Sequence, residues 1–366
     1  MERRLWQHLD WPLLLAVMAL TSVGLATIYS VTWNLTTSEP GGEFWRQVYA
    51  VPVGLVALIV CLSVDYRTLA QRSPLLYVAM VLALVAVMVF GVEAKGSRRW
   101  LNLGFGSLQP SEFARLALAL VLAMMYGGDS RRSARSIGEL MVGGLVLAPA
   151  VLLIFLQPDL GTASMLLPVY AGIAYVAGLR MRWVVGAVVV AALLSPVVWA
   201  YGLQDYQKGR VMTFLDPYKD PKGAGYQQIQ ARVTVGSGGM IGKGFGQGTQ
   251  GAYRFLPESH NDFVFAVLAE EQGFVGVIVV LGLYLFVIWR SLEAARLARD
   301  RVGAFLVVGL VSWFLCQVVY NITMQAGLVP VKGLTLPLMS YGGSSLVATL
   351  AGFGLILNVR MRRFTN

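Results

Sequence analysis

The sequence predicts an all-α integral membrane protein with ten transmembrane helices and one long external loop. Hydrophobic residues make up 57% of the 366 residues and charged residues only 13%, whereas about a quarter of an average soluble domain is charged. Mean hydropathy is +0.65. Apolar runs of about 20 residues, the length that crosses a hydrocarbon core, recur along the whole chain. These observations exclude a water-soluble fold and favour a single membrane domain over residues 1–366.

The apolar runs define the positions of the ten helices. The first run follows the segment 1–6, which has no small-x-small cleavage site, so we expect it to remain as an uncleaved signal anchor. Short polar hinges separate the runs, except for one long interval between the seventh and eighth helices. The predicted helices cover residues 11–30, 47–64, 74–92, 112–126, 140–156, 163–178, 183–202, 263–289, 304–324 and 343–358.

Lysine and arginine are distributed unevenly between the two sides of this predicted bundle. Ten spans place both termini on one side, where the loops and ends contain 16 of these residues. The short loops of the other side contain five, namely Arg46, Lys95, Arg98, Arg99 and Lys332. Because basic loops are retained in the cytoplasm, both termini are predicted to be cytoplasmic. Residues about 203–262 then form the external loop.

The net charge and the scarcity of cysteine and histidine narrow the function classes. The charge of +10 would suggest a nucleic-acid partner in a soluble protein, but here much of it lies in hinges and sets topology. We therefore expect no nucleic-acid binding. Cys61 and Cys316 both fall inside apolar runs, and only two histidines exist. Neither a disulfide framework nor a Cys/His zinc site is predicted.

The external loop has a composition that topology does not explain. It contains seven Lys and Arg residues, and ten glycines lie between Gly223 and Gly251. Long loops cross membranes largely regardless of their charge, and glycine at this density permits tight turns and close approach to a ligand. Composition alone supports two interpretations equally, a ligand-binding loop and a flexible, solvated one.

Ionisable residues at or inside the spans are the candidate functional groups, because such residues are costly in lipid. The acidic candidates on the external side are Glu112, Asp159, Asp262, Glu270 and Glu271, and the last two lie about 12 Å further along the helix that Asp262 opens. Basic residues face them from the same side: Lys95, Arg98, Arg99, Arg210, Lys243, Arg254 and Lys332. A pocket with both charges suits an anionic, lipid-attached substrate whose head group lies outside.

Several of these residues also have a purely structural interpretation. Asp262 and Asp159 each precede a helix and are suitable N-caps. Glu112 and Arg115 have the i,i+3 spacing of an intrahelical ion pair. Trp100 has the position of a membrane-interface anchor. The residues alone leave both interpretations open, and Glu270 and Glu271 are as consistent with pairing to a neighbouring helix as with catalysis.

Polar motifs follow one another over nearly the whole chain, at residues 95–101, 109–112, 157–162, 216–217, 223–226, 236–239, 242–244, 248–250, 256–258, 262–266, 270–271 and 337–343. In these motifs and their order the chain resembles the SEDS family (shape, elongation, division and sporulation), and within it the elongation branch, RodA. Asn261 departs from the threonine common in the family, and residues 330–337 look as much like the division branch, FtsW.

This resemblance implies a peptidoglycan glycosyltransferase that polymerises lipid II into glycan strands during cell elongation. It implies a multi-pass protein of the bacterial cytoplasmic membrane, with its active site facing outside, that works with a class B penicillin-binding transpeptidase. Asp262 matches the essential aspartate of the family. Trp100, Glu112, Asp159, Arg210 and Ser340 match other positions linked to activity or to the integrity of the pocket.

The mechanistic hypothesis is an inverting transfer from a growing strand that is linked to undecaprenyl pyrophosphate. Asp262 would accept the proton of the 4-hydroxyl of the incoming lipid II, and no second carboxylate nucleophile is needed because pyrophosphate is a good leaving group. The candidates that stabilise its charge are Arg99, Arg210, Lys243 and Lys332. A divalent cation, Mg²⁺ or Mn²⁺, is a candidate cofactor because such ions bind phosphoryl oxygens.

Two other functions use similar membrane architectures. A lipid II flippase would need ionisable groups near the midplane and a polar path from both sides, but the charges here crowd toward the outside. A scaffold that only activates a transpeptidase would leave those charges without a role. Because single-span partners dock on helix faces with small residues, the segment from Leu334 to Leu357 is the predicted docking region.

Overall fold

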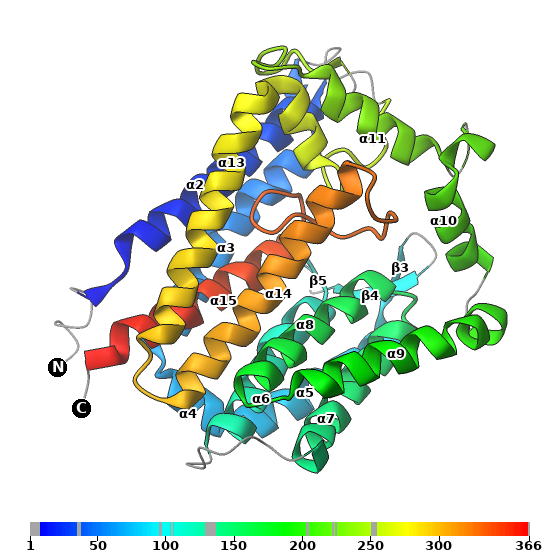
Figure 1. The fold of residues 1–366 in the computed structure, drawn as a ribbon. Coiled ribbons are helices and arrows are strands. Elements are labelled where there is room, and N and C mark those ends of the chain that lie inside the picture. The colour runs from blue at the N-terminus through cyan, green and yellow to red at the C-terminus, as the bar shows by residue number, and fades with distance from the viewer. Residues whose placement is uncertain are drawn as a thin grey trace.

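The computed structural model is a helical bundle, which confirms the predicted fold class (Figure 1). The structure describes residues 8–34, 38–94, 97–102, 104, 106–128, 137–202, 205–221, 223, 225–249 and 255–364. Its helices are α2 (Trp11–Thr32), α3 (Gly42–Ser63), α4 (Tyr66–Gln71), α5 (Ser73–Phe90), α6 (Ser111–Gly127), α7 (Ile137–Leu156), α8 (Leu160–Val176), α9 (Met181–Val197), α10 (Asp205–Leu215), α11 (Tyr226–Ser237), α13 (Val264–Arg296), α14 (Arg301–Gln325) and α15 (Gly343–Met361).

A helix occupies each of the ten positions that the apolar runs predict. Within the described residues, seven helices are long and apolar enough to cross a membrane: α2, α3, α5, α7, α13, α14 and α15. The other three predicted spans correspond to α6, α8 and α9, which have 17 residues each. Two predicted ends need correction, because α3 begins at Gly42 and α13 continues to Arg296. Both helices continue into segments with polar and charged side chains, and a prediction from apolar runs alone does not include such segments.

Short strands, which the sequence did not predict, connect some of the helices. A two-stranded antiparallel sheet pairs β1 (Trp33–Asn34) with β2 (Glu39–Pro40). A three-stranded sheet contains β3 (Val92–Ala94), β4 (Ser97–Asn102) and β5 (Ser107–Leu108). This second sheet lies between α5 and α6 in the chain, and its two strand pairs are antiparallel.

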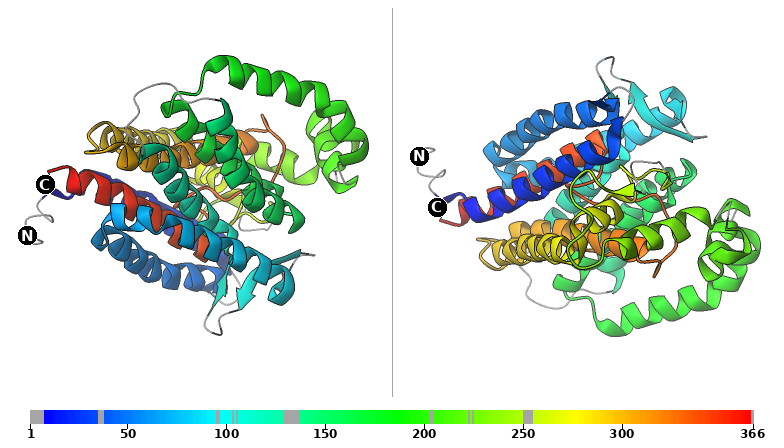
Figure 2. Two further views of the ribbon diagram at one scale, coloured as in Figure 1. Left: turned by 90° about the horizontal axis from the view of Figure 1, so that it is seen from below. Right: turned by 90° about the horizontal axis from the view of Figure 1, so that it is seen from above.

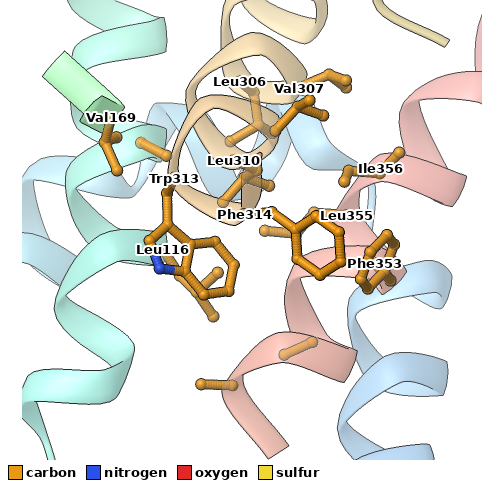
Figure 3. Packing of buried hydrophobic residues seen from close by; sticks show 14 of the residues in the cluster. Leu116, Val169, Leu306, Val307, Leu310, Trp313, Phe314, Phe353, Leu355 and Ile356 are labelled. Carbon is orange, nitrogen blue, oxygen red and sulfur yellow. The ribbon is translucent and has the colours of Figure 1, made fainter. Parts of the chain in front are cut away.

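The core of the bundle lies where α14 and α15 meet the helices around them. Figure 3 shows Leu310, Trp313 and Phe314 of α14 packed near Phe353 of α15, and the rings of Phe314 and Phe353 lie edge to face with centroids 5.2 Å apart. In α15, 89% of the apolar window is buried inside the protein. The segment from Leu334 to Leu357 is therefore largely packed inside the bundle, and its role as the partner-docking region stays a prediction.

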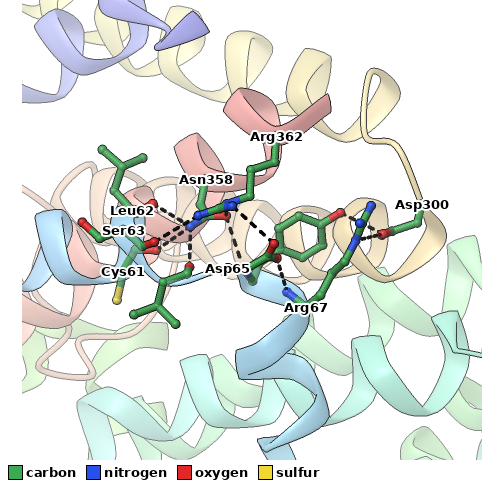
Figure 4. Close-up of polar contacts among 10 residues, drawn as sticks. Cys61, Leu62, Ser63, Asp65, Arg67, Asp300, Asn358 and Arg362 are labelled. Carbon is green, nitrogen blue, oxygen red and sulfur yellow. Dashed lines mark hydrogen bonds and ion pairs between the residues drawn. The ribbon is translucent and has the colours of Figure 1, made fainter. Parts of the chain in front are cut away.

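One end of the bundle is tied together by polar contacts between segments far apart in sequence (Figure 4). The Asn358 side chain donates hydrogen bonds to the carbonyls of Cys61, Leu62 and Val64, which end α3. At the same end, Asp10 before α2 forms an ion pair of 2.8 Å with Arg360 of α15. The start of α2 and the end of α15 therefore lie side by side.

The predicted external loop is partly helical. It contains α10, a 3₁₀ turn at Pro217–Lys219, and α11. In Figures 1 and 2, α9, α10 and α11 form an arm that runs around one side of the bundle. Glycines are concentrated after α11, in the segment 238–248 that leads back towards α13. The predicted external loop therefore contains helices as well as a glycine-rich segment.

Candidate functional site

The connection between α14 and α15, residues 326–342, lies at the centre of the candidate site. It has no helix or strand, and yet Leu334, Leu336 and Leu338 are buried in it. Buried irregular backbone needs partners for its peptide groups. Side chains supply them: Tyr320 Oη donates to the Pro330 carbonyl at 2.7 Å and Tyr284 Oη to the Pro337 carbonyl at 2.6 Å.

Three buried amide side chains on α14 hold this connection against α13. Gln317, Asn321 and Gln325 are spaced four residues apart, which places them on one face of the helix. Gln317 Nε2 donates to the Thr335 carbonyl at 2.9 Å. Asn321 Nδ2 donates to the Leu334 carbonyl at 2.6 Å. All three side chains are at most 2% exposed, so these bonds are made away from solvent.

The amide face also fixes the backbone around Asp262. Asn321 Nδ2 donates to the Asp262 carbonyl at 3.1 Å, and the first-turn N–H of Ala266 donates to Gln325 Oε1 at 2.5 Å. The N-cap residue of α13 is Phe263. The capping interpretation of Asp262 is therefore not supported, since the cap position falls one residue later.

The Asp262 carboxylate lies against the backbone of the connection. Gly333 has a φ of 68°, and a Cβ atom built on it would lie 3.5 Å from Asp262 Oδ2. Asp262 is half-buried, at the end of a turn in which its N–H donates to the Glu258 carbonyl at 3.1 Å. Glycine at position 333 therefore permits the left-handed turn and the close approach to the carboxylate.

Two of the predicted cations converge on the same three residues of the connection. Arg210 Nη1 of α10 donates to the Val331 carbonyl at 3.2 Å. Lys332 follows directly, and its Nζ lies 4.9 Å from the centre of the Tyr320 ring. Burial lowers the pKa of Lys332 from its ordinary value. Arg210, Lys332 and Asp262, which the sequence places in three separate segments, thus meet at residues 331–333.

Asp159 and Arg99 form the neighbouring part of the site. Asp159 caps α8 by accepting from the Thr162 N–H at 3.1 Å, so its structural interpretation is confirmed. Arg99 Nη1 lies 3.7 Å from Asp159 Oδ2. A Cβ atom on Gly161 would lie 3.0 Å from the Lys332 carbonyl oxygen. The start of α8 therefore touches the connection next to Lys332.

Glu112 forms a buried ion pair that is linked to the connection through Gln317. Its Oε2 lies 2.6 Å from Arg115 Nη2, which confirms the predicted i,i+3 pair. The Arg115 guanidinium also stacks 3.8 Å from the Trp313 ring and donates to Gln317 Oε1 at 3.5 Å. Since Gln317 holds the Thr335 carbonyl, this pair orients one of the amides that fix the connection.

The remaining predicted residues lie around this arrangement. Ser340 Oγ accepts from the Leu336 N–H at 2.8 Å and closes a turn of the connection. Trp100 lies half-buried in β4 and pairs with Val92, while Arg98 faces Glu93 at 3.8 Å. Lys95 and Arg254 lie outside the described residues. Ser340 thus belongs to the connection itself, whereas Trp100 lies in the sheet between α5 and α6.

Lys243 belongs to a second polar cluster. Its Nζ lies 2.6 Å from Glu270 Oε1 and 2.9 Å from Thr249 Oγ1. Glu271, the next residue, accepts from Ser30 Oγ of α2. Of the two interpretations left open for these glutamates, these contacts support pairing with neighbouring segments. Lys243 as a substrate-binding cation stays a prediction.

Three amides that the sequence interpretation missed, Gln317, Asn321 and Gln325, carry much of the geometry. Their i,i+4 spacing inside an apolar run was the available signal. Within the described residues, no three His, Cys, Asp or Glu side chains form a metal-ligating group. The divalent cation therefore stays a prediction from the chemistry of the leaving group.

The fold and the site together define a polytopic membrane protein with a charged site built on an interhelical connection. A family model described as the cell cycle protein family FtsW/RodA/SpoVE matches residues 10–364. The chain therefore belongs to this family, the SEDS family that its motifs resemble.

Individual relatives agree with this membership over nearly full length. Peptidoglycan glycosyltransferase MrdB of Escherichia coli strain K12 is 39% identical over 97% of this chain and 94% of its own. Stage V sporulation protein E of Bacillus subtilis is 36% identical over 96% of each chain. A solved structure of the rod shape determining protein RodA of Thermus thermophilus has a TM-score of 0.73 at 32% identity, over 98% of each chain.

A second solved structure extends the comparison to an assembly. It is described as showing the structural coordination of polymerization and crosslinking by a peptidoglycan synthase complex. Its matching chain has a TM-score of 0.84 at 36% identity, over 98% of this chain and 99% of that one. The architecture described above is thus shared with proteins of known structure.

Proposed function

We propose that this protein is a peptidoglycan glycosyltransferase that polymerises lipid II, with Asp262 as the general base. The observation that carries this proposal is the convergence of the Asp262 carboxylate with Arg210 and Lys332 at residues 331–333. The naming of full-length relatives as peptidoglycan glycosyltransferases supports the reaction class. The similarity to rod shape determining RodA supports a role in elongation.

In the proposed reaction, the 4-hydroxyl oxygen of lipid II attacks the anomeric carbon of the strand, which is bound to undecaprenyl pyrophosphate. The C–O bond to pyrophosphate breaks as the new glycosidic bond forms, and Asp262 accepts the hydroxyl proton. One carboxylate is enough for this inverting step, because a retaining step would require a second carboxylate about 5 Å away. Asp262 is half-buried, so its carboxylate remains accessible to a substrate hydroxyl.

The negative charge that develops on pyrophosphate needs cations that are already in place. Lys332 and Arg210 meet this requirement, because ring stacking holds Lys332 and the Val331 carbonyl orients Arg210. Arg99 stands beside Asp159 at the edge of the same connection. A bound Mg²⁺ or Mn²⁺ would add charge at the phosphoryl oxygens, and we propose to test it by chelation and readdition.

The proposal includes a partner and a membrane location. We propose that the protein resides in the bacterial cytoplasmic membrane, with the connection 326–342 at the outer face, and works with a class B penicillin-binding transpeptidase. The assembly that contains a similar chain supports a crosslinking partner. The buried α15 directs the search for the partner surface to the more exposed helices, such as α5 and α13.

Strand formation from purified lipid II tests the function. The assay compares the wild type with Asp262→Asn, in the presence of the transpeptidase and of a moenomycin-type inhibitor that silences contaminating polymerases. We expect strands from the wild type and none from the folded variant. Asp220→Asn is the matched control, because Asp220 is an exposed aspartate of the external segment whose side chain accepts a turn hydrogen bond from the Gly223 N–H. Normal turnover by Asp262→Asn would refute the base assignment.

A wild type that makes no strands under these conditions would reject the polymerase itself. The flippase and scaffold interpretations would then be tested next, by lipid II translocation into vesicles and by activation of the transpeptidase.

A further inference from the structure

The helix α13 is broken, and the break isolates a short segment behind Asp262. Gly273 has φ 64° and ψ −164°, which ends the helical path nine residues after Val264. The short segment, residues 264–272, is buried on every side up to Glu271, with no side chain from Val264 to Glu271 more than 5% exposed. We name it the half-helix. Asp262 lies at one end of it and Glu270 lies about 12 Å away at the other.

The glycine-rich segment 238–248 supplies the hydrogen bonds that the break removes. The N–H groups of Lys243 and Gly244 donate to the carbonyls of Glu270 and Glu271 at 3.0 and 2.9 Å. In return, Phe274 N–H donates to the Gly239 carbonyl at 2.9 Å. The open ends of both helical segments are thus satisfied. A Cβ atom on Gly273 would lie only 2.2 Å from the Gly242 nitrogen, so two glycines make this contact possible.

The side chain of Glu270 also holds the glycine-rich segment against the half-helix. Glu270 is fully buried. Its Oε1 accepts from Lys243 Nζ at 2.6 Å, from the Thr249 N–H at 3.1 Å and from Thr249 Oγ1 at 2.9 Å. A buried pair of this kind gives little net stability compared with well-packed apolar residues. Its direct effect is to fix one register of segment 238–248 on the half-helix.

We infer that Lys243 and Glu270 are positioning residues that hold Asp262 in its catalytic orientation through the half-helix. The amides Asn321 and Gln325 fix the near end of the half-helix, and the Lys243–Glu270 pair fixes the far end. A rigid helical segment held at both ends cannot rotate or slide, and the carboxylate at its end therefore stays against Gly333. This inference rests on the proposed function of Asp262.

The test measures strand formation by Lys243→Met, Glu270→Gln and the double variant, with Lys219→Met as the matched control. Lys219 is an exposed external lysine, 78% accessible, whose carboxylate partner lies 3.9 Å away. A misplacement of about 1 Å can reduce turnover by about a hundredfold. We therefore expect kcat to fall at least about tenfold in Lys243→Met, Glu270→Gln and the double variant, with KM for lipid II little changed. Lys243→Arg should restore part of the rate.

The double variant separates positioning from electrostatics. It removes one positive and one negative charge, so its net charge equals that of the wild type. A rate as low as that of the single variants indicates lost positioning. A rate restored to the wild-type value would instead assign the single-variant losses to charge and overturn the inference.

Hydrogen–deuterium exchange provides a readout that does not depend on activity. We expect faster exchange of the amides of residues 264–272 in Lys243→Met and in Glu270→Gln, with α14 unchanged. If either variant fails to fold, the other carries both measurements. Unchanged exchange together with unchanged kcat overturns the inference, while an inactive Asp262→Asn in the same assay keeps the proposed function. Loss of strand formation in the wild type would instead reject the proposed function.

Discussion

At the scale of single residues, the candidate site depends on neutral amides as much as on charges. Asn321 illustrates this, because one side chain joins the carbonyls of Asp262 and Leu334 and accepts from Gln325 Nε2 at 2.5 Å. The residue is fully buried. A buried carbonyl that loses its donor costs about 1–3 kcal/mol, so Asn321 contributes to both stability and geometry.

Replacement of Asn321 by Leu should therefore impair the enzyme more than a conservative core change. We expect a loss of about 1–3 kcal/mol in the free energy of unfolding and a fall of at least about tenfold in kcat. Thermal unfolding and strand formation measure the two effects. Thr323→Val on the same helix is the control, because Thr323 donates only within α14. Equal behaviour of the two variants would contradict the role of Asn321.

Lys332 gives the site a predicted pH dependence. Burial lowers the pKa of this lysine from 10.5, so it loses its proton at a lower pH than an exposed lysine. If its charge stabilises the leaving group, kcat/KM falls on the alkaline side before ordinary lysines titrate. Lys332→Arg should move that limb to higher pH, because arginine stays charged. An alkaline limb that does not move in the variant assigns it to another group.

The sequence located the charged residues of the site because ionisable groups are conspicuous in apolar runs. Asp262, Arg210 and Lys332 were all predicted, and the structure brings them to one place. The amides of α14 were missed because they are uncharged and sit in an otherwise normal span. Asp262 and Gly333 lie about 70 residues apart in the sequence, so no local pattern could predict that they lie close together.

At the scale of elements, α13 shows the limit of hydropathy. Apolar residues on both sides of Glu270 and Glu271 predict one continuous helix over residues 263–289, but the structure breaks the helix at Gly273. Glycine in an apolar run is common in membrane helices, so the sequence does not distinguish a break from a packing contact. The partner segment 238–248, which determines the break, lies before the turn that carries Asp262.

Replacement of Gly273 by Ala tests the importance of this break. The backbone conformation of Gly273, with φ 64° and ψ −164°, is essentially restricted to glycine and costs another residue about 1–3 kcal/mol. The added Cβ atom would also meet the Gly242 nitrogen at 2.2 Å. We expect a lower melting temperature and a strong loss of strand formation. Gly282→Ala, further along α13, is the matched control because a Cβ atom there meets nothing within 4 Å. A fully active Gly273→Ala would show that the break is dispensable.

At the scale of the whole molecule, one end of the bundle contains the candidate site and the other end contains polar contacts that stabilise the fold. The end with the connection 326–342 contains the predicted chemistry. The other end is held by Asn358 and by ion pairs such as that of Arg67 with Asp300, at 2.7 Å. Burial by itself would raise the pKa of Asp300, but hydrogen bonds from Gly303, Tyr66 and Arg67 lower it below the ordinary value.

Asp300 should make the stability of this end depend on acid. Its carboxyl has a lower pKa in the folded than in the unfolded protein, so the unfolded state binds more protons and stability rises with pH. The contribution is present above about pH 4 and is lost as the pH falls through the folded pKa. Asp300→Asn should lower the melting temperature at pH 7 and abolish this acid dependence. The same acid dependence in the variant would exclude Asp300 as its source.

The burial of α15 has a consequence for how the protein is made. This helix follows in sequence the helices α3, α6, α13 and α14 that pack against it, and its apolar window is the least hydrophobic of the seven long spans. A ribosome therefore delivers the central helix after its surroundings have entered the membrane. The inner faces of the earlier helices stay incomplete until α15 is inserted, so the core of the bundle can close only after the last helix has been synthesised.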